Sequence, residues 1–96
     1  MSERVTKLTL DDEGRLEFPC LYPVKALTRT SDCALKQVLA EIRAHAVVPD
    51  PSRITIRPSR HGRFQSLTIE VHAESRAQLE AVYGALRALD VVVMTL

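Results

Sequence analysis

Arginine side chains are concentrated in one short part of the 96-residue chain, between positions 53 and 63. Arg53, Arg57, Arg60 and Arg63 lie there together with His61, and the segment holds no Asp or Glu. A guanidinium group binds a carboxylate or a phosphate through two parallel hydrogen bonds. The segment therefore predicts a site for an anion, which is either a small ligand or an acidic protein surface. The alternative is that these charges only protect an exposed strand edge against aggregation.

The other reactive residue types form no known catalytic or metal-binding motif. Cys20 and Cys33 are too far apart in the sequence for a C-x-x-C pair. The histidines are not at H-x-H or H-E-x-x-H spacing, and the glycines do not form a phosphate-binding loop. We therefore expect no metal, no cofactor and no enzymatic activity. Two cysteines are also too few for a disulfide scaffold, which favours the reducing cytosol.

The overall composition is typical of one soluble globular domain, with 46% apolar and 26% charged residues. The net charge of +1 argues against a globally basic nucleic-acid-binding protein. No apolar run approaches the ~18 residues of a membrane span, and no apolar secretion signal follows Met1. We therefore expect a cytoplasmic protein that does not contact a membrane.

Hydrophobic periodicity predicts a strand and a helix in the first half of the chain. The strand covers residues 20–27, with Pro23 at its entry because proline cannot donate to a ladder. Three N-cap candidates follow at residues 30–32, and a helix begins behind them and ends near Ala46. The apolar face of this helix repeats at i, i+3, i+4 and i+7 and consists of Leu35, Val38, Leu39 and Ile42.

The second half predicts a hairpin, a helix and a last strand. Residues 53–59 and 66–72 alternate between apolar and polar types, which indicates two half-buried antiparallel strands. The second helix begins at Ser75, with Gln78 at capping-box spacing. Residues 91–96 are rich in β-branched types and form the last strand.

The resulting order, β-α-β-β-α-β, predicts an α+β fold of the ferredoxin-like class. This fold is a four-stranded antiparallel sheet of order 4-1-3-2 with two helices on one face. We assign residues 16–96 to this domain and residues 1–15 to an acidic extension, which is flexible or adds an edge strand over residues 6–10. The last strand is apolar on both faces and lies at an edge, so a second copy of the chain or the extension should cover it. We therefore expect a homodimer.

Alternation also assigns the two faces of the sheet. The residues expected beneath the helices are Ile54, Ile56, Leu67, Ile69 and Val71. The polar residues expected on the opposite face are Arg53, Thr55, Arg57, Ser66, Thr68, Glu70 and His72, together with Lys25.

Three segments of the chain resemble the YbeD-like family of small bacterial proteins. These segments are residues 16–25, the hairpin at residues 57–66 (RPSRHGRFQS), and the closing residues from Gln78 to Leu96. The resemblance implies a fold close to the ACT regulatory domains, which sense small ligands. In one departure, Thr28 stands where the family usually has a glycine after its first strand, which argues against an ACT-style pocket in that loop.

We therefore predict a cytosolic regulatory or adaptor module without catalysis, which binds an anionic small ligand or an acidic partner. Its predicted contact residues are Lys25, Arg53, Arg57, Ser59, Ser66 and Thr68. One alternative is a small acylphosphatase-like enzyme, but such enzymes need a catalytic Asn and the chain has no Asn. Another is an RNA-binding module of RRM-like topology. Its stacking platform is absent, because only Phe64 could serve among the few aromatic residues.

Overall fold

The computed structural model describes residues 16–96, so the acidic extension and the possible added strand lie outside the described residues. The strands are β1 (Cys20–Arg29), β2 (Thr55–Pro58), β3 (Phe64–Ala73) and β4 (Val92–Thr95). The helices are α1 (Ala34–Arg43) and α2 (Arg76–Arg87), and a short 3₁₀ helix, η1 (Pro51–Arg53), precedes β2.

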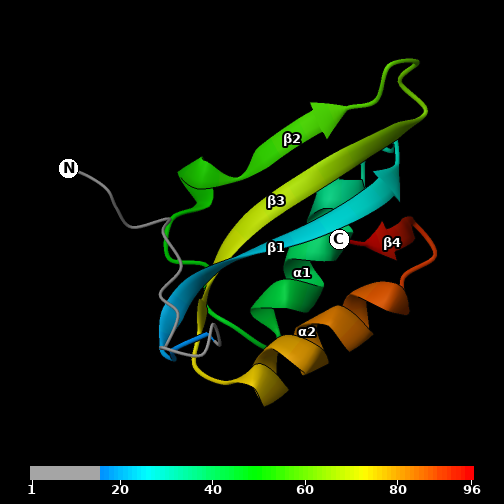
Figure 1. Cartoon of the computed structure of the whole chain (residues 1–96). Coiled ribbons are helices and arrows are strands. Elements are labelled where there is room, and N and C mark those ends of the chain that lie inside the picture. Colours follow the sequence, from blue (N-terminus) through cyan, green and yellow to red (C-terminus); the bar gives the residue numbers. More distant parts are fainter. Residues whose placement is uncertain (1–15) are drawn as a thin grey trace.

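The four strands form one antiparallel sheet of order β2-β3-β1-β4, and both helices cover the same face of it (Figure 1). This arrangement confirms the predicted ferredoxin-like fold and its strand order. The long strands β1 and β3 form the centre of the sheet and pair along ten residues each. The short strands β2 and β4 form its two edges.

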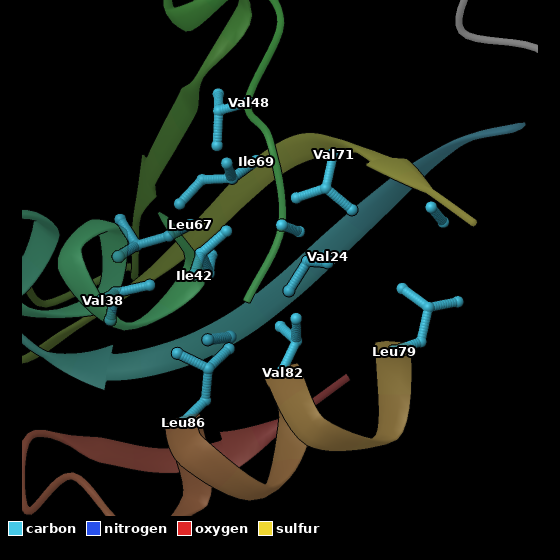
Figure 2. Close-up of a cluster of buried hydrophobic side chains, with 13 residues drawn as sticks. Val24, Val38, Ile42, Val48, Leu67, Ile69, Val71, Leu79, Val82 and Leu86 are labelled. Carbon is cyan, nitrogen blue, oxygen red and sulfur yellow. The ribbon is translucent and has the colours of Figure 1, made fainter. Parts of the chain in front are cut away.

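The core lies between the inner face of the sheet and the apolar faces of the two helices (Figure 2). Its largest fully buried side chains come from β1, β3 and both helices, and they include Val24, Val38, Ile42, Leu67, Ile69, Val71, Val82 and Leu86. Each such side chain contributes about 1.5–3 kcal/mol by leaving water. The predicted burial of β3 and of Val38 and Ile42 in α1 is therefore correct, whereas Leu35 and Leu39 on the predicted apolar face are only half-buried.

The predicted burial of Ile56 is wrong, because its side chain is 46% exposed. Ile56 pairs with the buried Leu67 and so faces the side of the helices. However, β2 is an edge strand, and the core is centred on β3 and β1. Alternation assigns the face of a side chain correctly, but it does not show how far the helices cover that face.

Two predicted boundaries also differ from the structure. The strand expected from residue 53 begins at Thr55, because Pro51 starts the 3₁₀ turn η1 and the Asp50 carboxylate accepts the Ser52 N–H at 3.1 Å. The helix expected directly behind residues 30–32 begins one residue later, with Cys33 as its N-cap. The Ser31 hydroxyl instead accepts the N–H of Cys33 at 3.2 Å.

Pro23 lies within β1 rather than at its entry. The N–H of Leu96 donates to the carbonyl of Lys25, and the N–H of Arg29 donates to the carbonyl of Val91, so odd-numbered residues of β1 point their backbone groups toward β4. The nitrogen of Pro23 therefore points to the same side, beyond the end of β4. A proline fits there because β4 provides no acceptor at that level.

Candidate functional site

The outer face of the sheet, which the helices leave uncovered, carries a shallow hollow of about 360 Å³. We call it the anion hollow, and the residues that line it are Lys25, Thr55, Arg57, Ser66, Thr68 and Leu96. Four of the six predicted contact residues (Lys25, Arg57, Ser66 and Thr68) therefore lie together, although they come from three different strands.

The register of the sheet brings these side chains together. Thr55 lies opposite Thr68 on β3, and Thr68 lies opposite Lys25 on β1, so these three form one row across the sheet. Arg57 and Ser66 form the next row. Residues paired across antiparallel strands share a face, so both rows point away from the helices. The hollow thus has hydroxyl groups at its centre and one cation on each side.

Leu96 closes the hollow beside Lys25, since its N–H donates to the Lys25 carbonyl at 3.0 Å. Sequence reasoning missed Leu96, because a bulge opposite Leu27 and Thr28 sets the register of β4 and leaves no trace in the sequence pattern. It placed Thr55 on the correct face without selecting it for the site. The signal that could have selected Thr55 is its pairing with Thr68, which follows once the register of the hairpin is known.

The two cations of the hollow are exposed, and no carboxylate among residues 16–96 forms an ion pair with Lys25 or Arg57. The acid nearest to this site along β3 is Glu70, which lies on the same face one row beyond Thr68. Glu70 is occupied by Arg53, whose Nε lies 3.0 Å from its Oε1. Among residues 16–96, the charged side chains that line the hollow are therefore both positive and unpaired.

Arg53 itself lies outside the hollow, in η1, although the sequence placed it among the contact residues. Its place beside Glu70 gives it a different role, because it neutralises the carboxylate that lies nearest to the hollow along β3. It is a positioning residue of the site rather than one of its lining residues.

Ser59 also lies outside the anion hollow and instead shapes the β2–β3 hairpin. Its hydroxyl accepts the N–H of Phe64 at 3.2 Å, and its N–H donates to the Phe64 carbonyl at 2.8 Å. Its carbonyl accepts the N–H of Gly62 at 3.0 Å, and Gly62 has a φ of 75°, which a glycine adopts without strain. These contacts account for Ser59 and Gly62 by turn geometry.

The other reactive groups of the described part of the chain are dispersed. Within residues 16–96, no group of three His, Cys, Asp or Glu side chains is placed to hold a metal ion. Cys20 is half-buried, and burial raises the pKa of its thiol, whereas Cys33 is exposed at the start of α1. No helix in this part of the chain is both long and apolar enough to span a bilayer.

Comparison with known proteins shows which family this chain resembles. The family described as "Protein of unknown function (DUF493)" matches residues 13–96. A UPF0250 protein of Nitrosomonas europaea is 32% identical over 87 residues, which cover 91% of this chain and all of the relative. A UPF0250 protein of Chromobacterium violaceum is 38% identical over 82 residues, which cover 83% of this chain and 90% of the relative.

A solved structure supports the architecture independently. The solution structure of protein HP0495 from H. pylori superposes with a TM-score of 0.63 over 90% of each chain, at 19% sequence identity. At this identity the likeness concerns the fold and does not transfer a function to the residues of the hollow.

Proposed function

This chain belongs to the DUF493 family of proteins of unknown function, in agreement with its resemblance to YbeD-like proteins, and we propose that it is a non-catalytic module that binds a small anionic ligand in the anion hollow. One observation carries the proposal: Lys25, Arg57 and three hydroxyl groups from neighbouring strands line the same hollow. We further propose that it acts in the cytoplasm as a regulatory or adaptor protein, as the family's resemblance to ACT regulatory domains suggests by analogy.

The spacing of the two cations suits a small ligand held between them. Lys25 and Arg57 are two strands and one row apart, so strand geometry separates their Cα atoms by about 12 Å. Long, flexible side chains can close on a carboxylate or phosphate group from both sides at this separation. Hydroxyl donors at Ser66 and Thr68 then lie below the anion and fix its orientation.

The lining of the hollow supports binding rather than turnover. It contains no His, Cys, Asp or Glu, so it lacks the side chains that serve most often as general base or as strong nucleophile near neutral pH. The acylphosphatase-like alternative receives no support, since the sequence has no Asn. A small ligand is favoured over an acidic protein surface because the cations border a concavity.

The test is a titration of the ¹⁵N-labelled protein with acetate, citrate, inorganic phosphate and pyrophosphate at constant ionic strength. At least one of these anions should shift the amide signals of the lining residues. Arg57→Ala should weaken its binding by about tenfold, the effect of losing about 1.4 kcal/mol from a charge-assisted contact. Arg76→Ala, which removes an exposed arginine from α2, is the matched control and should change nothing.

Two further variants test the role assigned to Arg53. Arg53→Ala leaves Glu70 unpaired beside the hollow and should weaken the same anion, while Arg53→Ala with Glu70→Gln should restore binding. The proposal fails if none of the four anions binds at the hollow, or if Arg57→Ala and Arg76→Ala affect binding equally.

We also propose that a second copy of the chain pairs along β4. Val93 and Met94 on this edge strand are 46% and 49% exposed, and Leu96 follows at 57%. Half of the exposed large apolar side chains of residues 16–96 thus lie in the four-residue segment 93–96, on or directly after β4. An apolar strand edge of this kind favours pairing with another strand.

A further inference from the structure

Phe64 lies next to the anion hollow on the same face of the sheet. It is the first residue of β3, and residues two apart along a strand share a face, so it continues the line of Ser66 and Thr68. Phe64 pairs with Arg29 across β1 and bonds to Ser59 across the hairpin, which makes it the next row after Arg57 and Ser66. Its Cα therefore lies about 7 Å beyond Ser66 along the strand.

A second hollow surrounds Phe64, at the end of the hairpin. It has a volume of about 710 Å³ and is lined by Ser59, Arg60, His61, Arg63 and Phe64. The loop is fixed at both ends, since Ser59 and Phe64 bond to each other and the Arg63 carbonyl accepts the N–H of Thr30 at 2.9 Å. The loop between these bonds presents a partly exposed aromatic ring beside the Arg60 and Arg63 side chains.

We infer that these neighbouring hollows together bind a nucleoside phosphate, with the phosphate in the anion hollow and the base stacked on Phe64. This inference rests on the proposed function and adds the class of ligand. Phe64 is 37% exposed, so its ring is accessible to a base. Every base has a π face, and Arg60 and Arg63 add cation–π contacts at the rim of the second hollow.

The chemistry of the surroundings favours a base on this side of the anion hollow. From residue 51 to residue 69 the chain has no acid, so nothing there repels a second phosphate or an electron-rich ring. The end of the anion hollow toward β4 is bordered by Leu96, with exposed Met94 nearby on β4. A ligand with an alkyl chain would extend toward that end instead, and the two directions can be separated by mutation.

Calorimetry with adenosine 5′-monophosphate, ribose 5-phosphate and inorganic phosphate tests the inference. Adenosine 5′-monophosphate should bind more tightly than ribose 5-phosphate. Phe64→Ala should weaken it by about five- to 150-fold, the range for loss of one base–aromatic contact, and should leave the affinity for the two probes without a base unchanged. Phe64→Trp should preserve the preference for the base.

Ile56→Ala is the matched control, because Ile56 is a similarly exposed apolar residue on the other face of the sheet. Equal affinity for adenosine 5′-monophosphate and ribose 5-phosphate would overturn the inference, as would a loss at Met94→Ala with no loss at Phe64→Ala. In either case, retained phosphate binding that depends on Arg57 would leave the proposed function standing. If inorganic phosphate does not bind, the inference is overturned, and the proposed function then depends on the binding of acetate or citrate.

Discussion

Within residues 16–96, two buried hydroxyl oxygens find no partner at hydrogen-bonding geometry, one on Thr28 in β1 and one on the half-buried Tyr83 in α2. Burial raises the pKa of Tyr83 to about 12, with the neighbouring Tyr22 phenol adding to the effect. Thr28 is fully buried inside β1, whereas the sequence placed it in a loop after this strand. Its side chain therefore faces the core and has no part in a loop pocket.

The orphaned hydroxyl of Thr28 predicts a stabilising substitution. Thr28→Val replaces the hydroxyl by a methyl group of similar size, and removal of an unsatisfied buried polar group should raise the free energy of unfolding by about 1 kcal/mol. Urea denaturation monitored by circular dichroism measures the change. Thr68→Val on the outer face is the control and should leave stability within about 0.5 kcal/mol. A less stable Thr28→Val protein would show that the hydroxyl has a partner in solution.

At the scale of elements, Gln78 joins the two helices. Its N–H donates to the Ser75 hydroxyl at 3.1 Å, as the capping-box spacing predicts. Its side-chain oxygen accepts the N–H of Glu74 at 2.7 Å, and its side-chain NH₂ donates to the carbonyl of His45 at 3.0 Å. The start of α2 is therefore fixed to the turn that follows α1.

This double role predicts that Gln78 matters more than the N-cap alone. Ser75→Ala should lower the free energy of unfolding by about 1 kcal/mol, the usual cost of a lost N-cap. Gln78→Ala loses two side-chain hydrogen bonds and should cost about 1–3 kcal/mol. Gln78→Glu keeps the acceptor and loses the donor, so its stability should lie between wild type and Gln78→Ala. If thermal unfolding ranks Gln78→Glu with wild type, the contact to His45 contributes nothing.

The elements also show what the sequence could and could not predict. Alternation in β3 and the helical repeat through Ile42 are local patterns that match the buried face, so the fold and the placement of four predicted contact residues on the outer face followed from them. The exposure of Ile56 depends on how far the helices cover the sheet. The position of Leu96 beside the hollow depends on the bulge in the pairing of β1 with β4. These are tertiary features without a local signal, as is the pairing of Arg53 with Glu70.

At the scale of the whole molecule, β4 is one of the two edges of the sheet. It pairs with β1 at only three positions, with a bulge between Leu27 and Thr28. Leu96 directs its N–H toward β1, so by alternation the backbone groups of Thr95 point away from the sheet. Apolar side chains at Val93 and Met94 accompany this edge. An antiparallel second copy would pair these groups and bury these side chains.

This geometry predicts a dimer that one charge should dissociate. Light scattering of the purified full chain should give twice the monomer mass at ~100 µM, and Val93→Lys should give a monomer, since lysine on an edge strand opposes strand pairing. The matched control is Ile56→Lys, because Ile56 is also 46% exposed but lies on the opposite edge strand, and this variant should stay dimeric. Unchanged circular dichroism in both variants would confirm that each still folds. A monomeric wild-type chain, or a Val93→Lys chain that remains dimeric, would exclude β4 as the interface.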